Sequence, residues 1–576
     1  MGDNENRKVY KARQVKNYRE MVEYSCKNYA QNIAYKYKKD YTAKNVEYIE
    51  KTYEQVGKDI KAFGTGLLNL DLMGERIVVV GKNRYEWCIS YLATTCSNMV
   101  IVPIDKALPD IEMQRLIERS EAKAIIFDEK YLETIKKVQE KENSNLKTLI
   151  CMDNIQEKGI KTFNEILEEG RNQIKNGDQK YDNIEIDENK MSIMLFTSGT
   201  TNEPKAVMLS QANICANISN IACWVKLYPT DVLLSFLPIH HTFECTITFL
   251  YGFYSGSQVA FCDGLKHIQQ NLKEYKVSVF VAVPLVLETM YKKIQKAIEE
   301  QGKTGLIKKM TKISNTLLKA KIDIRKIVFK QILYNFGGHL RVVLYGAAPM
   351  NKATIIGYNN LGISLVQGYG LTETSPVVTA ETDKEKRPGS IGLALANLNL
   401  KIANPDNEGV GEITVKGPSV MLGYYKNPEE TKKVLKDGWF STGDYGYKDK
   451  DGFVYITGRK KDIIVLKNGK NVYPQEIEFL INKIPYIAES LVYSRDKDTT
   501  DTMLCAKIVY DKDAIKQMIG EKTEEEYKEI IWQEIKKINQ ELPIFKKIKN
   551  ITITTEPLKK TTTQKVKRYE ELKNLT

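Results

Sequence analysis

Short apolar runs alternate with amphipathic stretches of helical period between about residues 50 and 290, and this alternation restricts the fold more than any other feature. The helical stretches include Tyr85–Thr95 and Ile111–Ser120. The apolar runs are Arg76–Val80, Met99–Ile104, Ala124–Phe127, Thr148–Met152 and Met191–Phe196. Short apolar strands separated by helices are typical of parallel sheets that are covered on both faces. The sequence therefore predicts an α/β fold with a large, multi-layered N-terminal domain built on parallel-rich sheets.

The length of 576 residues and a change of pattern near residue 411 predict a second, smaller domain. A single hydrophobic core stops growing beyond about 250–300 residues. After Gly411, short strands are joined by turns that contain Gly and Asp, and a smaller α/β pattern begins near Arg459–Asp462. We therefore predict an N-terminal domain over residues 1–459 and a C-terminal α/β domain over residues 460–576.

Composition restricts the partners and the compartment only in part. The net charge of +13 suits anionic partners, but the lysines are scattered, so charge alone does not predict nucleic-acid binding. The nine cysteines show no disulfide or metal-ligand spacing, which favours a reducing, cytoplasmic compartment. No apolar run reaches the ~18 residues of a membrane span. Residues 298–335 are basic and helical in period, and we expect a solvated face there, with contact to anionic lipid as the alternative. The oligomeric state is left open.

A hydroxyl-rich loop after the apolar run that ends at Phe196 is the stretch that indicates chemistry most directly. Small residues let backbone amides approach phosphate oxygens, hydroxyls add donors, and a lysine adds a cation. The loop is not the P-loop of NTPases, because Pro204-Lys205-Ala206 stands where that motif needs Gly-Lys-Ser/Thr. Taken alone, such a stretch is more often a Ser/Thr-rich turn without a ligand. The candidate phosphate-binding residues are Thr197, Ser198, Gly199, Thr200, Thr201 and Lys205.

This loop and later motifs, in the same order, resemble the adenylate-forming superfamily of acyl-CoA synthetases, peptide-synthetase adenylation domains and luciferases. The chain departs from the usual loop at Asn202, where glycine is common, and at Ala206, but neither change removes a donor. The resemblance covers the chain from about residue 20 to 570. Its later motifs are Gly346–Pro349, Gln367–Thr374, Ser441–Asp444, Gly458–Asp462 and Thr561–Arg568.

The resemblance implies a role for each nucleotide-site residue. Tyr369 would stack on adenine, Thr372 would meet the α-phosphate, and Asp444 would bind the ribose, with donors added by Arg459. Mg²⁺ would be held by Glu373 and Thr200, which suits an ion that takes one or two carboxylates from protein. Taken bare, an aspartate after a glycine is usually a turn residue. The remaining candidates for nucleotide binding are Gly346, Ala347, Ala348, Gln367, Gly368 and Gly370.

The resemblance also implies three residues for catalysis and one for the thiol substrate. Lys565 matches the catalytic lysine, although Gln564 replaces the common glycine; the nearby alternatives are Lys559, Lys560 and Lys567. Lys461 matches a hinge about which the C-terminal domain would move. His241 would lie beside the acyl and adenylate groups, although a histidine after a Leu-Pro turn is about as often a hydrogen-bonded core residue. Gly469 would border the channel for pantetheine.

Together these motifs predict an ATP- and Mg²⁺-dependent ligase that activates a fatty acid as acyl-AMP and transfers it to coenzyme A. The stretches 460–464 and 468–474 look most like bacterial long-chain fatty acyl-CoA synthetases. Two alternatives stay open: an adenylating enzyme that delivers the acyl group to a carrier protein, and a non-catalytic nucleotide- or acyl-binding protein on the same fold. The predicted partners are therefore the fatty acid, ATP and coenzyme A, and no nucleic acid. The acyl chain length is not predicted.

Overall fold

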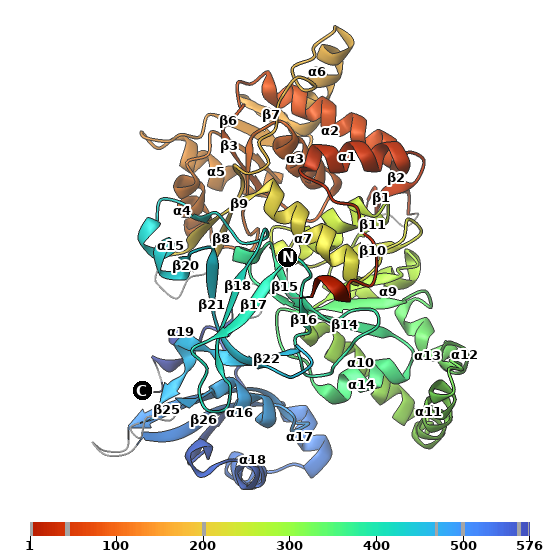
Figure 1. Cartoon of the computed structure of the whole chain (residues 1–576), viewed down its shortest axis with the longest axis vertical. Coiled ribbons are helices and arrows are strands. Elements are labelled where there is room, and N and C mark those ends of the chain that lie inside the picture. The colour runs from red at the N-terminus through yellow and green to blue at the C-terminus, as the bar shows by residue number, and fades with distance from the viewer. Residues whose placement is uncertain are drawn as a thin grey trace. The chain divides into compact units, whose positions relative to one another are not determined.

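The computed structural model describes residues 4–40, 46–197, 203–466, 471–496, 502–560, 566–573 and 575. The chain forms two compact units, which are described separately (Figure 1). Unit 1 contains residues 1–400 and 415–440, and unit 2 contains residues 401–414 and 441–576. The domain boundary expected at residue 460 stays a prediction. No helix in the described ranges combines the length and apolar character that crossing a membrane requires.

The first sheet of unit 1 contains all five of the predicted apolar runs as strands. Its order is β19-β9-β8-β4-β3-β5-β6-β7, and the strands from β8 to β7 are parallel. These strands are buried because helices such as α3 cover the sheet, which explains their continuous apolar pattern. The strand bounds are β3 Arg76–Val80, β4 Val100–Pro103, β5 Ala124–Phe127, β6 Thr148–Cys151, β7 Ile160–Thr162, β8 Met191–Thr197, β9 Lys205–Ser210 and β19 Gly423–Tyr424.

The second sheet of unit 1 has nine strands in the order β16-β15-β14-β13-β12-β10-β11-β1-β2. The strands from β14 to β1 are parallel, so the segments that follow β10, β13 and β14 leave the sheet at one edge. Ligands of open α/β sheets commonly bind at such carboxyl ends. The bounds are β1 Ile33–Lys38, β2 Tyr48–Thr52, β10 Val232–Ser235, β11 Gln258–Phe261, β12 Val279–Ala282, β13 Val342–Tyr345, β14 Ser364–Gly370, β15 Val377–Ala380 and β16 Leu393–Ala394.

Helix α7 (Gln211–Trp224) lies between the two sheets of unit 1 (Figure 1). It packs against β8 and β9 of the first sheet and β15 of the second, and it is buried along its whole length. A capping box of Ser210 and Asn213 starts it. The other main helices are α1 Tyr18–Asn28, α2 Tyr53–Leu68, α3 Tyr85–Cys96, α4 Asp110–Ser120, α5 Leu132–Gln139, α6 Phe163–Lys175, α9 Ile268–Glu274, α10 Pro284–Glu300, α11 Thr304–Lys319, α12 Arg325–Val328, α13 Lys330–Leu333, α14 Lys352–Asn360 and α15 Pro428–Val434.

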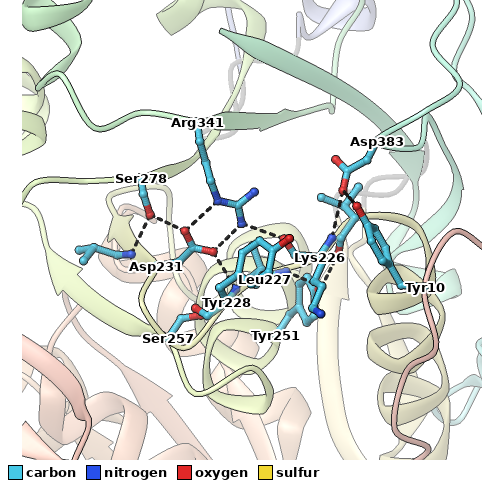
Figure 2. Close-up of polar contacts among 12 residues, drawn as sticks. Tyr10, Lys226, Leu227, Tyr228, Asp231, Tyr251, Ser257, Ser278, Arg341 and Asp383 are labelled. Atoms are coloured by element: carbon cyan, nitrogen blue, oxygen red, sulfur yellow. Dashed lines mark hydrogen bonds and ion pairs between the residues drawn. The ribbon is translucent and has the colours of Figure 1, made fainter. Parts of the chain in front are cut away.

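A polar network closes the second sheet at the amino ends of β10, β12 and β13 (Figure 2). Arg341 donates two hydrogen bonds to the buried Asp231, from Nε to Oδ1 at 2.8 Å and from Nη2 to Oδ2 at 2.5 Å. Ser278 Oγ donates to Asp231 Oδ1 at 2.7 Å. Although burial opposes it, these bonds hold the pKa of Asp231 below its ordinary value. Arg341 also donates to the Lys226 carbonyl at 2.8 Å. The network therefore ties together the starts of three strands at the edge opposite the predicted ligand segments.

Unit 2 has its own hydrophobic core, which includes Val492, Ile531 and Ile535. Its three-stranded sheet has the order β25-β26-β27, and β21 pairs with β22 in a separate sheet. Two residues each of β17, β18 and β21 belong to unit 1. The bounds are β17 Asn399–Ala403, β18 Gly411–Lys416, β21 Trp439–Lys448, β22 Val454–Arg459, β23 Ile464–Val465, β24 Asn471–Val472, β25 Ile487–Asp496, β26 Thr502–Tyr510, β27 Asn550–Thr554, α16 Pro474–Ile481, α17 Lys512–Ile519, α18 Glu524–Glu541 and α19 Arg568–Leu572.

Candidate active site

Strands β8 and β9 form the hairpin that carries the hydroxyl-rich loop. Their antiparallel register places Thr197 opposite Lys205, and the Thr197 hydroxyl donates to the Lys205 carbonyl at 3.4 Å. The hairpin therefore holds the two ends of the predicted phosphate-binding loop side by side. The other four candidates, Ser198, Gly199, Thr200 and Thr201, lie outside the described residues.

Lys205 is held by two residues that the sequence did not single out. Its Nζ lies 2.5 Å from Glu430 Oε2 on α15 and 5.0 Å from the ring centroid of Tyr424 on β19. Hydrogen bonds from Lys205 and Lys433 lower the pKa of Glu430 to about 2. Lys205 is thus a cation held in place by an ion pair with the half-buried Glu430.

Glu373 also contacts Tyr424. It belongs to a short 3₁₀ turn, η6 (Thr372–Thr374), and its Oε1 accepts the Tyr424 hydroxyl proton at 3.0 Å. Burial and the neighbouring Glu373 raise the pKa of Tyr424 well above its ordinary value, so the phenol stays a donor. Tyr424 therefore joins the predicted phosphate cation Lys205 and the predicted Mg²⁺ ligand Glu373 in one cluster.

Helix α7 holds the backbone that follows Glu373 through hydrogen bonds of Asn217. Asn217 donates to the Val377 carbonyl at 2.7 Å and accepts the Val377 amide proton at 3.2 Å. A Cβ on Gly370 would stand 1.9 Å from the Pro376 oxygen, so only glycine allows this close turn. The turn that presents Thr372 and Glu373 is consequently rigid on its buried side.

The predicted adenine segments meet at the carboxyl ends of β13 and β14. A Cβ on Gly346 would stand 2.6 Å from the Gly368 oxygen, so the two backbones touch. Ala347 and Ala348 continue from Gly346 as exposed residues, and Tyr369 is half-buried next to Gly368. The structure thus brings these segments together and leaves their ends accessible.

The side chain of Gln367 has a structural partner. The buried Tyr345 hydroxyl donates to Gln367 Oε1 at 2.9 Å. The backbone amide of Gln367 donates to the buried Glu381 at 3.0 Å. These bonds fix the end of β14, so Gln367 positions the neighbouring Tyr369.

His241 ends the segment that follows β10. Its Nδ1 accepts the Phe243 amide proton at 3.2 Å, which assigns the ring proton of the neutral imidazole to Nε2. The ring of Phe243 lies 3.9 Å from the place where a Cβ on Gly346 would stand. The His241 segment therefore borders the predicted adenine segment.

Glu244 is a third residue that the sequence did not single out. It begins a π-helix (Glu244–Tyr251), a form that is rare and often found at functional sites. Burial raises its pKa to about 8, although contacts with Ser235, Thr248 and the Phe236 amide oppose the shift. In the sequence, the feature that could have pointed to Glu244 is a single carboxyl in an otherwise uncharged run, three residues after His241.

In unit 2, Asp444 and Arg459 face each other across β21 and β22. Arg459 Nε lies 3.0 Å from Asp444 Oδ1, and the aspartate is buried whereas the guanidinium is partly exposed. The backbone amide of Asp444 donates to the Thr442 hydroxyl at 3.1 Å. Lys461 follows in the 3₁₀ turn η7 (Lys460–Asp462) as an exposed residue. The structure thus brings together the predicted ribose ligand, its arginine and the predicted hinge.

The described residues on the two sides of the C-terminal loop pair with each other. Lys565 and Gly469 lie outside the described residues. Lys560 and Val566 form an antiparallel bridge, and the Lys567 amide donates to the Lys559 carbonyl at 2.8 Å. The alternative lysines have partners: Lys560 Nζ lies 2.6 Å from Glu489, and Lys567 Nζ lies 2.9 Å from Glu570.

The segment after this loop is tied to the predicted hinge turn. Arg568 Nη1 lies 2.6 Å from the buried Glu478, and its Nε lies 4.0 Å from Asp462. Gln475 also donates to Asp462, at 2.7 Å. The segment that begins at Arg568 and the turn of Lys461 are therefore connected in unit 2.

Two family models cover most of the chain. One, described as AMP-binding enzyme, matches residues 22–425, and one described as AMP-binding enzyme C-terminal domain matches residues 461–575. The solved structure of the anthranilate CoA ligase AuaEII in complex with anthranoyl-AMP has a TM-score of 0.76 and covers 98% of each chain at 18% identity. ATP-bound MatB from Rhodopseudomonas palustris has a TM-score of 0.73, covering 97% of this chain and 99% of that one at 22% identity. These structures show the adenylate-forming fold.

Curated relatives narrow the family further. Long-chain-fatty-acid–CoA ligase 6 of Mus musculus is 30% identical over 498 residues, which cover 81% of this chain and 70% of that protein. The long-chain-fatty-acid–CoA ligase FadD15 of Mycobacterium bovis is 29% identical, covering 77% of this chain and 74% of that one. A chloroplastic long-chain-fatty-acid–[acyl-carrier-protein] ligase of Arabidopsis thaliana is 28% identical, covering 85% and 76%. The predicted resemblance is thus confirmed, and the chain belongs to the AMP-binding enzyme family of adenylate-forming acyl-CoA ligases, with fatty-acid–CoA ligases among its homologues.

Proposed function

We propose that this protein is an ATP- and Mg²⁺-dependent ligase that activates a long-chain fatty acid as acyl-AMP and transfers the acyl group to coenzyme A. The observation that carries the proposal is the cluster of Lys205, Tyr424 and Glu373, which sets a cation and a carboxylate around one tyrosine beside the hydroxyl-rich hairpin. The fatty-acid–CoA ligases among the homologues support the choice of substrate. A cytoplasmic location stays a prediction.

In the first step a fatty-acid carboxylate oxygen attacks the α-phosphorus of ATP. A phosphorus–oxygen bond forms, the bond to the β-phosphate breaks, and pyrophosphate leaves. This step needs charge neutralisation more than proton transfer. The ATP phosphates would displace Glu430 from Lys205, and Lys565 would supply a second cation. Holding the acid in line with the α-phosphate removes much of the entropic barrier.

Glu373 fits a Mg²⁺ ion by its chemistry. It is a half-buried carboxylate with one oxygen bonded to Tyr424, and Mg²⁺ usually takes only one or two carboxylates from protein. Glu373 and Thr200 would hold the ion, which would neutralise phosphate charge when bound. No cluster of three metal-binding side chains occurs among the residues the structure describes.

Each unit carries residues that the proposal assigns to the nucleoside. Tyr369 would stack on adenine. The backbones at Gly346 and Gly368, which touch each other, would lie beside the adenine ring. The Asp444 carboxylate would accept both ribose hydroxyls, while Arg459 balances its buried charge.

In the second step the coenzyme A sulfur attacks the acyl carbon and a carbon–sulfur bond forms. The bond from that carbon to the phosphate oxygen breaks, AMP leaves, and the thiol proton is released to solvent. We infer that residues 460–576 turn about Lys461, withdrawing Lys565 and bringing Gly469 to the pantetheine arm. The Nε2–H of His241 would donate to the acyl or adenylate oxygens.

A carrier protein is the second candidate acceptor. The homologue from Arabidopsis thaliana is named as an acyl-carrier-protein ligase, and it is nearly as similar as the coenzyme A ligases. Acyl transfer to the phosphopantetheine of a carrier would use the same adenylate. A non-catalytic nucleotide- or acyl-binding protein is the remaining alternative.

The test is product analysis by mass spectrometry with ATP, Mg²⁺ and fatty acids of graded length, with coenzyme A, with an acyl carrier protein or with neither. We expect AMP and acyl-CoA to rise together. Lys205→Ala should lower AMP formation about 100-fold. The matched control Lys433→Ala, which also removes a partner of Glu430, should retain activity. Acyl transfer only to the carrier protein would mean that the carrier, and not coenzyme A, is the acyl acceptor. Absence of AMP with every acid would refute the proposed ligase activity.

A further inference from the structure

The segment from residue 303 to 334 combines positive charge with exposed apolar side chains. It comprises α11, α12 and α13 with their connections and is called here the α11–α13 surface. Figure 1 shows these helices in green at one end of unit 1, outside its two sheets. The segment contains nine Lys and Arg residues and one acidic residue, Asp323, so its net charge is +8. Asp323 is itself paired with Arg325 at 2.7 Å. This surface therefore carries more than half of the protein's net charge of +13.

Large apolar side chains on this surface are exposed to solvent. Their exposed fractions are 54% for Leu306, 48% for Ile313, 52% for Ile322, 77% for Ile327 and 62% for Tyr334. Leu318, at 36%, is a sixth. Single exposed apolar residues are ordinary, but six within one short segment are not needed for packing. They indicate a face that meets an apolar environment.

The helical geometry of α11 separates its apolar and basic residues. At about 100° per residue, Leu306 and Ile313 share one stripe because they are seven residues apart. Lys308, Lys312 and Lys319 share a second stripe, and Lys309 lies between the two. An apolar stripe beside lysines is the pattern of a helix that lies in a membrane interface, where long lysine side chains extend to the headgroups.

The α11–α13 surface is firmly attached to unit 1. Asn315 donates to Asn360 at 2.9 Å, and Arg325 donates to the Asn359 carbonyl at 2.6 Å, both at the end of α14. Ser314 and Phe329 are fully buried on the inner side. The outward residues are therefore held in place rather than spread over a loose loop.

The combination of charge and apolar side chains selects one partner. A second copy of the chain would place the same net charge of +8 opposite this surface, and the repulsion opposes association through this face. The backbone phosphates of a nucleic acid would pair with the lysines, but they would offer no apolar contact to Ile327 or Leu306. An anionic lipid surface satisfies both, because each basic residue near it contributes about 1 kcal/mol and the apolar side chains enter the acyl boundary.

We propose that the α11–α13 surface docks the protein onto anionic lipid membranes, with lysines on the phosphate headgroups and Leu306, Ile313 and Ile327 in the interface. The inference does not rest on the proposed ligase reaction, because it concerns binding without ATP or acid. It adds a location at which a membrane-dissolved substrate would be met.

The experiment is co-sedimentation of the full chain with vesicles of phosphatidylcholine alone and of phosphatidylcholine with about 30% phosphatidylglycerol. We expect binding to the anionic vesicles only, and loss of binding at high salt. A charge variant, Lys308→Gln with Lys309→Gln and Lys312→Gln, should bind at least about tenfold more weakly. The corresponding three Lys→Arg changes should retain binding. An apolar variant, Leu306→Ser with Ile313→Ser and Ile327→Ser, should also lose about tenfold.

Matched controls lie on exposed positions elsewhere. They are Lys528→Gln with Lys536→Gln and Lys537→Gln on α18, and Met73→Ser with Ile111→Ser and Ile544→Ser. Both controls should bind like the unmodified protein. Equal binding to neutral vesicles, or equal losses in the control variants, would overturn the proposal. It would also be overturned if the apolar variant changed only a monomer–dimer equilibrium in sedimentation, or if plasmid DNA bound more tightly than the anionic vesicles.

Discussion

At the scale of single residues, Glu244 shows how strongly burial changes a side chain. Its carboxyl lies in the fully buried first turn of the π-helix and accepts a hydrogen bond from Thr248 at 2.9 Å. Burial raises its pKa from an ordinary 4.5 to about 8, so the folded protein keeps the group neutral at pH 7. A neutral carboxyl can donate as well as accept, and it sits three residues from His241. Glu244 therefore positions the segment that carries His241.

Replacing Glu244 with glutamine should change how stability depends on pH. Between pH 4.5 and 8 the unfolded chain loses this proton while the folded chain keeps it, so the wild type becomes less stable as pH rises through that window. The Glu244→Gln protein lacks this loss, and the difference should reach on the order of 4 kcal/mol by pH 8. Denaturant unfolding at several pH values would measure it.

The neighbouring titratable groups should not obscure this result. The thiols of Cys88, Cys245 and Cys262 face Glu244, and burial raises the pKa of each, that of Cys262 to about 11. They stay protonated throughout the window. Parallel stability curves for the wild type and Glu244→Gln would contradict the proposed burial of a neutral acid.

Tyr424 gives a second prediction at this scale. Loss of its hydroxyl in Tyr424→Phe removes the hydrogen bond to Glu373, which is worth about 1.5–3 kcal/mol because the acceptor is charged. We expect roughly tenfold more Mg²⁺ to be needed for half-maximal pyrophosphate release, together with weaker thermal stabilisation by ATP and Mg²⁺. Tyr425→Phe is the matched control, because that hydroxyl bonds Glu121 at 3.1 Å instead. An unchanged Mg²⁺ requirement would remove Tyr424 from the site.

At the scale of elements, the two edges of the second sheet have different tasks. The carboxyl ends of β10, β13 and β14 carry His241, Gly346 and Tyr369, whereas the amino ends are closed by the Asp231 network of Figure 2. Structural polar networks at one edge leave the other edge open for ligands. The two edges should therefore respond differently to substitution.

Arg341→Ala should reduce stability without changing the site. It leaves the buried Asp231 without its main cation, which should lower the free energy of unfolding by about 2–4 kcal/mol. The KM for ATP should stay within about twofold, because the network lies at the amino edge. Arg115→Ala, at an exposed position on α4, should change stability by less than about 0.5 kcal/mol. A large rise in KM would mean that the two edges are coupled.

The elements that could be predicted from the sequence are those with a local pattern. The apolar runs 76–80 and 124–127 are strands because parallel strands are buried on both faces, which leaves a continuous apolar signal. Tyr424 and Glu430 were missed because they reach Lys205 from more than 200 residues away, through the pairing of β19 with β9. Pairing over such a distance leaves no local pattern. Glu244 was missed because its role depends on burial, which periodicity does not report for one residue.

At the scale of the whole molecule, the candidate residues divide between the two units. Lys205, Glu373 and Tyr369 belong to unit 1, whereas Asp444, Lys461 and Lys565 belong to unit 2. Each unit has its own core, so each can keep its local geometry while the other moves. The proposed reaction uses this division, because only its first step needs Lys565 near the α-phosphate.

The two half-reactions should therefore respond differently to Lys565→Ala. Acyl-AMP formation should fall about 100-fold, because a cation is lost where charge develops. Transfer from chemically supplied acyl-AMP to coenzyme A should stay within about threefold, because the loop would be withdrawn in that step. Lys567→Ala is the control, since Lys567 is paired with Glu570 and should affect neither step. Stopped-flow or quenched assays of each half-reaction would measure both rates. Equal losses in the two steps would mean that Lys565 stays at the site throughout, and the proposed turn about Lys461 would then be wrong.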